Sequence, residues 1–403
     1  METIEAFRAR AEIWLAANMP RVGEVHTAED DDDGLGPWTR ARELQRTLHD
    51  GGFAGIAFPA EYGGLGLTRE HQLAFNEASR GYEMPILLNV PTFTILAATL
   101  LDHGNEEQKH RHIPAILRGD EVWVQFLSEP SGGSDLASAR TRATRDGDVY
   151  VINGSKIWSS GAFAADYAMI LARTNWDVPK HAGLTMFIVE IHQPAIQLNR
   201  IKQVNGSREF CEEFFDDVVV PATAIVGRED DGWAVATTLL GHEKNAVGGG
   251  SPYSSGATAL VERASPLQDL LELARADLDD GHVQELLGEA VALHALRPHV
   301  IAGVTQRIKR GELPTPATAI LKLFDATTQV RATDIAVELA GQSAASASGG
   351  RVGEMFISRQ ARCLAGGSNE IQRNIISERV LGMPREPAAD RGVPFKDVST
   401  GRS

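Results

Sequence analysis

Three stretches of the chain combine glycines with hydroxyl or flat aromatic side chains, which could bind a planar or anionic ligand. The first, residues 126–138, reads Phe-Leu-Ser-Glu-Pro-Ser-Gly-Gly-Ser-Asp-Leu-Ala-Ser and carries hydroxyls at Ser128, Ser131 and Ser134. Its Gly-Gly pair would let the backbone come close to a ligand and donate N–H groups to it. By residue types alone, an ordinary polar turn is the commoner use of such a stretch.

The second stretch places the indole of Trp158 beside the hydroxyls of Ser159 and Ser160. An indole face could cover a planar ring. A single tryptophan in a strand is more often part of a core, so the pattern taken alone favours packing.

The third stretch, residues 365–373, has Gly366 and Gly367 followed by Ser368, a residue type typical of a helix N-cap. The N-terminus of a helix offers unpaired N–H groups to an electron-rich ligand. A capped helix without any ligand fits the same residues equally well.

The elements that must position these stretches follow from the hydrophobic period, which changes twice along the chain. Residues 1–120 have helical spacing and predict an N-terminal helical domain. Residues 121–228 contain short apolar runs without a helical period between them, which predicts a central β-barrel or sandwich domain. Residues 229–386 predict a C-terminal helical bundle, and residues 387–403 a mobile tail. The predicted fold is therefore α+β and multidomain.

The same patterns predict the individual elements. Helices are expected over residues 4–15, 37–48, 69–82, 89–103, 233–246, 261–274, 282–309, 317–339 and 369–381. Strands are expected over residues 122–127, 149–152, 155–158, 167–172, 184–191, 196–201 and 210–220. The Asn153-Gly154 pair lies between two of these strands and predicts a hairpin with a type I′ turn.

Composition limits the kinds of partner that the protein can have. The 403 residues carry a formal net charge of −15, which argues against nucleic-acid or anionic-membrane binding. Two cysteines, Cys211 and Cys363, cannot form a disulfide scaffold. The acidic start of the chain is unlike a secretory signal, and the longest apolar stretch, Ile95–Leu101, is far shorter than the ~20 residues of a membrane span. We therefore expect a soluble, cytoplasmic protein, with the acidic run at residues 29–33 as a solvated loop.

Several segments resemble the acyl-CoA dehydrogenase family and occur in the family's order across nearly the whole chain. They are Gly52–Gly66, Gly104–Lys109 with Ile113-Pro114 and Gly119, Ser128–Asp135 with Asn153–Trp158, and Gly367–Pro384. The resemblance implies the domain order already predicted: helical, β and helical. It also implies an FAD cofactor, an acyl-CoA substrate and α,β-dehydrogenation, with electrons passed to an electron-transferring flavoprotein.

The resemblance also assigns cofactor-binding residues. Phe126, Leu127, Ser128, Gly133 and Ser134 would belong to the loop that holds the isoalloxazine ring, with Ser128 facing the ring and Ser134 directed towards phosphate or substrate. The segment Trp158, Ser159 and Ser160 would cover the flavin, with Ser160 near N5, and Ser368 and Glu370 would touch the cofactor from the C-terminal domain. In this family the segment with His103, His110 and His112 is a connection between helix and loop, so we expect no metal site.

The reaction needs a carboxylate that removes an α-proton, and hydrogen bonds that stabilise the charge developing on the thioester carbonyl. Many family members carry a glutamate directly before the Gly-Thr/Ser of the C-terminal loop, but that position here is Gly366. The backbone of this loop could still donate an N–H to the thioester oxygen. A subset of the family places the base on the first helix of the C-terminal domain, which identifies Glu243 as the expected base, with Lys244 in place of the usual arginine near the substrate.

Two family motifs are missing from the chain. Arg-x-x-Phe-Gly does not occur between Glu243 and Val291, and Gln-x-x-Gly-Gly appears only as Glu338-Leu-Ala-Gly-Gln-Ser. Both motifs serve a neighbour's flavin in homotetrameric relatives. Their loss fits a heteromeric member, similar to the enzymes of steroid side-chain breakdown, in which a partner subunit supplies these contacts.

Three alternatives stay open. A homodimer or homotetramer with altered FAD contacts fits the missing motifs as well as a heteromer does. The chain could be a non-catalytic subunit that completes the active site of another chain: Lys244 and the two missing motifs favour this role, whereas the intact flavin-loop residues favour the enzyme. A flavin oxidase of the same fold is the third alternative.

Overall fold

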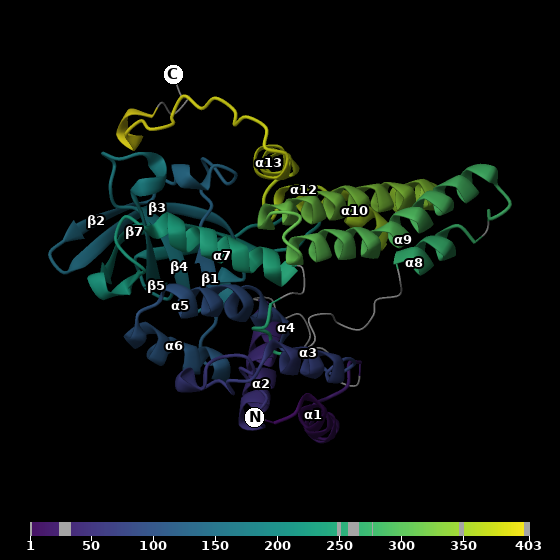
Figure 1. Ribbon diagram of the computed structural model, residues 1–403, viewed down its shortest axis with the longest axis horizontal. Coiled ribbons are helices and arrows are strands. Elements are labelled where there is room, and N and C mark those ends of the chain that lie inside the picture. Colours follow the sequence, from purple (N-terminus) through teal and green to yellow (C-terminus); the bar gives the residue numbers. More distant parts are fainter. Residues whose placement is uncertain are drawn as a thin grey trace. The chain divides into compact units, whose positions relative to one another are not determined.

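The computed structural model describes residues 2–23, 34–247, 251–256, 266–275, 277–345 and 350–398, so the acidic run at 29–33 lies outside the described residues. The chain forms two compact units, whose elements are labelled in Figure 1. The first unit contains Met1–Lys202, Arg208–Val261 and Asp390–Ser403, and the second contains Gln203–Ser207 and Glu262–Ala389.

The N-terminal region is helical, as predicted. Its helices are α1 (Ile4–Asn18), α2 (Gly36–Asp50), α3 (Arg69–Ala78), α4 (Ile86–Leu88), the π-helical η2 (Asn89–Ala97), α5 (Ala98–His103) and α6 (Glu106–Arg118). Caps fix their ends: Asn105 and Gln108 form a capping box at the start of α6, and Gly119 ends it in the left-handed conformation. Among the described residues, the segment Ile86–His103 is long and apolar enough to cross a membrane, but 67% of it is buried in the structure.

The central domain is one eight-stranded sheet. Its strands are β1 (Trp123–Phe126), β2 (Arg142–Asp146), β3 (Val149–Ser160), β4 (Tyr167–Arg173), β5 (Leu184–Glu190), β6 (Ile196–Arg200), β7 (Phe210–Pro221) and β8 (Ile225–Val226). They follow the order β6-β7-β3-β2-β4-β5-β8, and β1 pairs in parallel with β4. The strands predicted at the positions of β1, β4, β5, β6 and β7 are confirmed.

The hairpin predicted at Asn153-Gly154 is wrong. β3 continues through both residues, and the true turn lies between β2 and β3 at Gly147, which has φ 60°. Asn153 instead exchanges two 2.9 Å hydrogen bonds with Asp217 of β7, where the register of the two strands shifts. Gly154 is needed because a Cβ atom there would lie 2.8 Å from the Cα of Thr141. The Asn-Gly pair thus forms a β-bulge and not a turn.

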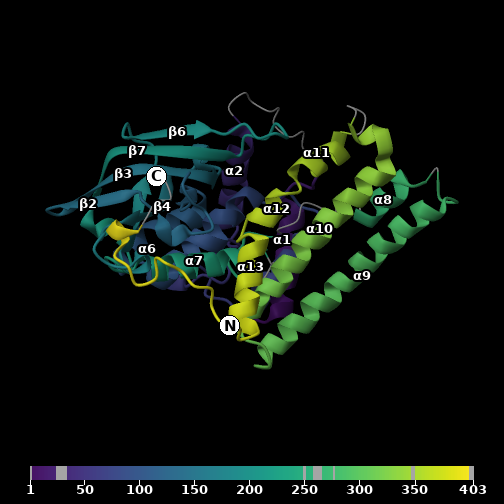
Figure 2. The same cartoon turned by 90° about the horizontal axis from the view of Figure 1, so that it is seen from above.

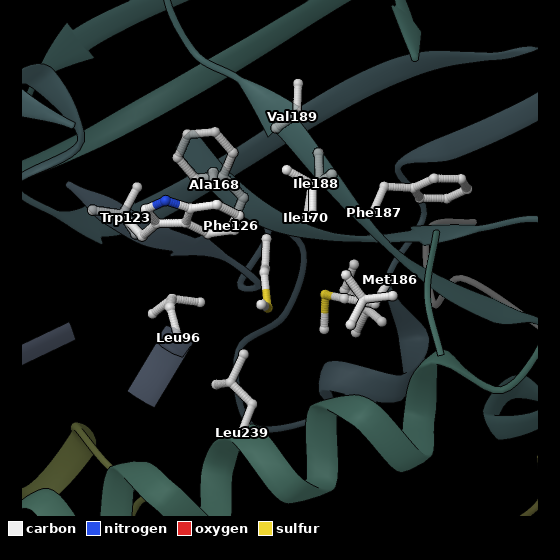
Figure 3. Close-up of a cluster of buried hydrophobic side chains, with 14 of the residues drawn as sticks. Leu96, Trp123, Phe126, Ala168, Ile170, Met186, Phe187, Ile188, Val189 and Leu239 are labelled. Carbon is white, nitrogen blue, oxygen red and sulfur yellow. The ribbon is translucent and has the colours of Figure 1, made fainter. Parts of the chain in front are cut away.

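Helix α7 (Gly232–Val247) belongs to the first unit, although the sequence predicted it as the start of the C-terminal bundle. Val235, Ala236 and Leu239 lie in the same buried cluster as the apolar residues of the sheet. Figure 3 shows Leu239 pointing from its helix into this cluster, towards Leu96 and Met186. The apolar side of α7 therefore packs into a core that the sheet shares with the N-terminal helices η2 and α5.

The second unit is helical. It contains α8 (Pro266–Leu273), α9 (Gly281–Lys309), α10 (Thr318–Ala340), α11 (Gly350–Ser358), α12 (Ala361–Leu364) and α13 (Asn369–Ile375), followed by the π-helical η10 (Ile376–Val380). α9 and α10 lie side by side in Figure 2, joined by the ion pair of Arg331 with Glu289 at 2.7 Å. The core of this unit comprises Leu270, Ala274, Leu286, Leu287, Ala290, Ile335 and Ala336.

The expectation of a mobile tail at 387–403 is wrong for residues 390–398. Phe395 is 1% exposed, and its segment packs against the β domain within the first unit. An aromatic side chain buried in this way opposes the disorder expected of a polar terminus.

Candidate active site

Glu243 faces the β domain. It follows Leu239 by four residues on α7, which places both side chains on the same side of the helix. Its Oε2 atom accepts a hydrogen bond from Nε2 of Gln125 on β1 at 3.1 Å, and the residue is half-buried. Gln125 precedes Phe126, where the glycine-rich loop begins. Helix α7 thus brings the candidate base next to the loop expected to hold the cofactor.

The neighbours of Glu243 point elsewhere. Nε2 of His242 lies 2.8 Å from Oδ2 of Asp102, and Lys244 is exposed. Successive residues of a helix project about 100° apart, so Glu243 and Lys244 cannot share one direction. The substrate contact of Lys244 stays a prediction.

The glycine-rich loop has a buried start and an open middle. Phe126 and Leu127 are buried, with 0% and 6% exposure, and their side chains belong to the core. Any contact of these two residues with a ligand would therefore come from the backbone. Ser128 is half-buried, whereas Gly133 and Ser134 are exposed.

A buried ion pair anchors this loop to β3. Nζ of Lys156 lies 2.9 Å from Oε1 of Glu129 and donates a second hydrogen bond to the carbonyl of Leu127, also at 2.9 Å. The Glu129 carboxylate also accepts from the backbone N–H groups of Arg140 and Thr141 at 2.7 and 2.8 Å. Burial lowers the pKa of Lys156, which Glu129 opposes. Burial alone would raise the pKa of Glu129, but Lys156 and the two N–H groups outweigh it and hold that pKa below its usual value.

Trp158 adopts an unusual backbone conformation beside this loop. Its φ is 71°, which non-glycine residues rarely adopt, and the β3–β7 register shifts between Ile157 and Ser159. The indole is 55% exposed and lies edge-on to Phe210, with ring centroids 5.8 Å apart. The bulge turns the indole out of the sheet, where its face is open to a ligand.

The two serines after Trp158 face opposite ways. Ser160 is exposed, but Ser159 is buried and donates a hydrogen bond to Oε2 of Glu213 at 3.1 Å. A contact of Ser159 with a ligand would therefore use its backbone. Glu213 is 0% exposed, and burial raises its pKa to about 8.

The predicted site residues of the second unit form a capped helix start. Ser368 caps α13, with its Oγ accepting from the N–H of Ile371 at 3.3 Å, and Glu370 in the first turn is exposed. Gly366 and Gly367 have φ of 66° and 89°, and Nε2 of Gln372 donates to both carbonyls at 3.1 and 3.2 Å. The N-terminal backbone of α13 and the Ser368 hydroxyl lower the pKa of Glu370. The cofactor contacts predicted for Ser368 and Glu370 stay predictions.

The prediction that the segment with the three histidines is a connection between helix and loop is wrong, because His103 ends α5 and both His110 and His112 lie within α6. Each histidine has a different partner. His103 contacts the hydroxyl of Thr238, His110 the carbonyl of Glu106, and His112 the carboxylate of Glu121, each at 2.8 Å. Within the described ranges, the structure contains no group of three or more His, Cys, Asp and Glu side chains arranged to hold a metal ion.

Comparison with known proteins identifies the family. The models of the N-terminal, middle and C-terminal domains of acyl-CoA dehydrogenases match residues 1–120, 125–218 and 230–381. The chain belongs to the acyl-CoA dehydrogenase family. Together the three matches span most of the chain, in the order that the sequence motifs indicated, and they support its assignment as an acyl-CoA dehydrogenase, an oxidoreductase.

Individual relatives cover almost the full chain. Acyl-CoA dehydrogenase IpdE1 of Mycobacterium tuberculosis is 36% identical over 402 residues, which are 96% of this chain and 99% of the relative. The solved structure of the Tcur3481-Tcur3483 steroid ACAD has a TM-score of 0.72 and 28% identity, with 96% and 99% of the two chains covered. The ChsE4-ChsE5 complex from Mycobacterium tuberculosis has a TM-score of 0.70 and 28% identity, with the same coverage.

The side chains of the first unit fit the flavin that this acyl-CoA dehydrogenase family uses. Trp158 offers an exposed indole face, and Ser134 and Ser160 offer exposed hydroxyls. A Cβ at Gly133 would lie 3.6 Å from Oγ of Ser128, an ordinary contact distance, so the exposed Gly133 backbone lies next to the Ser128 hydroxyl. Such a set of donors beside an aromatic face suits a planar ring with polar edges.

Four residues that the sequence reasoning did not assign complete the site: Gln125, Glu129, Lys156 and Glu213. Lys156 and Glu213 are Cα partners in the register of β3 and β7, and both are 0% exposed. The sequence signal that could have identified Lys156 and Glu213 is a charged residue at an inward-facing position of each of two paired strands.

Proposed function

We propose that the chain catalyses FAD-dependent α,β-dehydrogenation of an acyl-CoA thioester, with Glu243 as the catalytic base. The observation that carries this proposal is the 3.1 Å hydrogen bond between Glu243 and Gln125. It directs a half-buried carboxylate towards the strand that leads into the glycine-rich loop. A carboxylate on the solvent side of α7 would have no access to a ligand held by that loop.

In the proposed reaction, Glu243 removes the α-proton of the thioester while the β-hydrogen leaves as hydride. When bound, FAD supplies the hydride acceptor. Gln125 keeps the carboxylate oriented through its Nε2 donor. Gly366 has no carboxylate to act as a base, but the backbone of its loop could donate an N–H group to the thioester oxygen.

Seven residues would hold the cofactor through side chains or loop backbone: Ser128, Gly133, Ser134, Trp158, Ser160 and, through their backbone, Phe126 and Leu127. Trp158 would cover one face of the isoalloxazine ring, because its backbone conformation turns the indole outward. Ser368 and Glu370 would act from the N-terminus of α13. Ser159 would contribute only its backbone, since its hydroxyl is bonded to Glu213.

Glu243→Gln tests the base. The variant should fold and keep its flavin, because Gln occupies the same volume, but thioester-dependent reduction of the flavin under anaerobic conditions should fall by about 10²–10⁴-fold or more. Glu107→Gln, at an exposed position of α6, is the matched control and should react normally. Near-normal turnover of Glu243→Gln would reject the assignment and favour a non-catalytic role for this chain.

The electron acceptor can be tested with the same reduced enzyme. We propose an electron-transferring flavoprotein as acceptor, and IpdE1, the relative with 36% identity, is named a dehydrogenase. After bleaching by a thioester, the flavin should be reoxidised by an electron-transferring flavoprotein much faster than by air. Fast reoxidation by oxygen alone would identify an oxidase instead.

We also propose that the chain works with a second acyl-CoA dehydrogenase subunit. Two of the similar structures are named as two-component assemblies, Tcur3481-Tcur3483 and ChsE4-ChsE5. Large apolar side chains of the second unit are exposed, among them Val291 (46%), Leu296 (50%), Leu364 (66%) and Leu381 (67%). These side chains are available for contact with a partner subunit, and a continuous patch of such residues is typical of an interface.

Mass measurement and flavin titration test this partnership. The chain purified alone should bind FAD weakly, and co-expression with the product of a neighbouring acyl-CoA dehydrogenase gene should give a mixed complex with more bound FAD. A homomeric mass with saturating flavin would show that no second subunit is needed.

A further inference from the structure

Asp390–Val398, the last described residues, belong to the first unit and pack against the connection between β4 and β5. We refer to this segment as the C-terminal clasp. Its backbone is fixed by hydrogen bonds from the N–H of Phe395 to the carbonyl of Val178 at 2.8 Å and from the N–H of Lys396 to the carbonyl of Trp176 at 3.0 Å. The clasp is therefore an ordered part of the β domain.

Phe395 covers the guanidinium group of Arg173. The ring is 1% exposed, and the Arg173 Cζ atom lies 3.6 Å from its centroid. Arg173 itself is 0% exposed, and burial lowers its pKa to about 10. A cation stacked on an aromatic face is held more strongly when water is excluded, so Phe395 fixes the position of this guanidinium.

Arg173 in turn holds the turn that follows the glycine-rich loop. Its Nη2 and Nε atoms donate hydrogen bonds to the carbonyls of Ala137 and Ala139 at 2.6 and 3.0 Å. These residues lie in and directly after the short 3₁₀ turn Leu136–Ser138. Arg173 is thus connected to the loop backbone on one side and to the clasp on the other.

A second connection runs through Lys180. Its Nζ atom lies 2.9 Å from both carboxylate oxygens of Asp135, the last residue of the Ser128–Asp135 loop, and 2.6 Å from Oδ2 of Asp390 in the clasp. Lys180 is only 16% exposed in its side chain. One ammonium group therefore joins the end of the loop to the start of the clasp.

We infer that the C-terminal clasp positions the flavin loop: Phe395 acts through Arg173, and Asp390 through Lys180, to hold residues 135–139 in the conformation that binds FAD. The start of the loop is anchored by Glu129 and Lys156, so the clasp supplies the corresponding anchor at its end. A loop fixed at both ends loses less conformational entropy when a ligand binds. This inference rests on the proposed function, because it takes the loop to be the FAD site. Phe395 and Asp390 are positioning residues and would not touch the cofactor.

Phe395→Ala in the full chain is the principal test, with two readouts. The dissociation constant for FAD should rise by about tenfold or more, and backbone amides of residues 136–141 should exchange hydrogen for deuterium faster by a similar factor. Phe395→Tyr keeps an aromatic face and should restore both values. Phe214→Ala, at a β7 position that is 42% exposed, is the matched control and should change neither.

Asp390→Asn gives a second test that leaves the packing of the clasp intact. It should weaken FAD binding by a smaller factor, since only the ion pair with Lys180 is lost. Normal FAD affinity in both Phe395→Ala and Asp390→Asn would overturn the inference, even if amide exchange were faster. A wild-type chain that binds no FAD, with or without a partner subunit, would contradict the cofactor assignment in the proposed function. Unchanged amide exchange in Phe395→Ala would contradict the inference itself, because it would show that the clasp does not hold the loop.

Discussion

Gln125 is the side chain through which the β domain contacts the candidate base. It is half-buried on β1, and among the described residues its Oε1 atom is buried without a hydrogen-bond partner while Nε2 donates to Glu243. A hydrogen bond to a charged group contributes about 1.5–3 kcal/mol. Gln125 therefore restricts the directions that the carboxylate can take.

Replacing Gln125 by leucine should slow the enzyme without unfolding it. We expect kcat to fall by about 10–100-fold, with FAD affinity nearly unchanged, because the carboxylate loses the donor that orients it. Stopped-flow reduction of the flavin by a thioester measures this effect. Gln197→Leu, at an exposed position of β6, is the control. Equal rates for both variants would mean that Glu243 needs no orientation by β1.

Glu213 is a buried carboxyl group with only one hydrogen-bond partner among the described residues, the hydroxyl of Ser159. Lys156, its register partner, is already paired with Glu129. One buried cation cannot neutralise two carboxylates, and burial raises the pKa of Glu213 to about 8. The folded protein therefore keeps Glu213 protonated at neutral pH.

Protonation of the Glu213 carboxyl group makes the free energy of unfolding depend on pH. An unfolded glutamate has its pKa near 4.5, so between pH 4.5 and about 8 the folded state binds more protons than the unfolded state. The stability due to Glu213 is full below pH 4.5 and is lost as pH rises towards 8, with a slope of up to about 1.4 kcal/mol per pH unit. Glu213→Gln removes this slope, which urea unfolding at about pH 5 and pH 8 would measure. Identical pH slopes in wild type and variant would contradict the raised pKa.

At the scale of elements, β3 and the glycine-rich loop depend on one buried ion pair. Lys156 is 0% exposed, and its ammonium group bonds Glu129 and the carbonyl of Leu127. Removing one partner leaves a buried charge unpaired, which costs about 3–5 kcal/mol. The Lys156–Glu129 pair therefore stabilises the conformation of the glycine-rich loop against β3.

Lys156→Met should lower the free energy of unfolding by about 3–5 kcal/mol. The double variant Lys156→Met/Glu129→Gln should recover part of this loss, because no unpaired charge remains. Arg145→Met serves as the control, since the Arg145–Glu229 pair is exposed on both sides and contributes little. Chemical denaturation measures all three variants. A double variant less stable than the single one would show that charge burial is not the cause.

At the scale of the whole molecule, the chain has separate hydrophobic cores. The largest cluster includes Leu96, Trp123, Phe126 and Leu239 in the first unit, whereas the second unit has its own small core around Leu286 and Ile335. Beyond Ala290, helix α9 exposes Val291, Leu296 and Ile301. A helical unit with few buried residues gains less from folding than the β domain does.

Calorimetry of the isolated chain should therefore resolve two transitions, with the second unit unfolding first. Ile335→Ala, in the core of that unit, should lower only the first transition. Binding of a partner subunit to the second unit should raise the same transition. One cooperative transition that Ile335→Ala shifts as a whole would mean that the two units unfold together.

Local patterns in the sequence determined much of the architecture. Short apolar runs predicted β1, β4, β5, β6 and β7, apolar spacing predicted α1, and Ser368 with the apolar stripe after it predicted α13. Helix α6 was not predicted, although its capping box is local. The motif order predicted the family and the region of the site. These features depend on residues close together in the chain, so their physical cause is present in the sequence itself.

The tertiary structure decided how these parts meet. Asn153-Gly154 is a strong turn signal, but pairing with β7 made it a bulge inside one strand. Helix α7 belongs to the first unit because its apolar side packs into the core shared by the sheet and the N-terminal helices, and this placement brings Glu243 to Gln125. Phe395, in a segment that the sequence predicted to be mobile, is buried against the guanidinium group of Arg173. Each outcome depends on a partner far away in the chain, and no local period records which distant surface a side chain will bury.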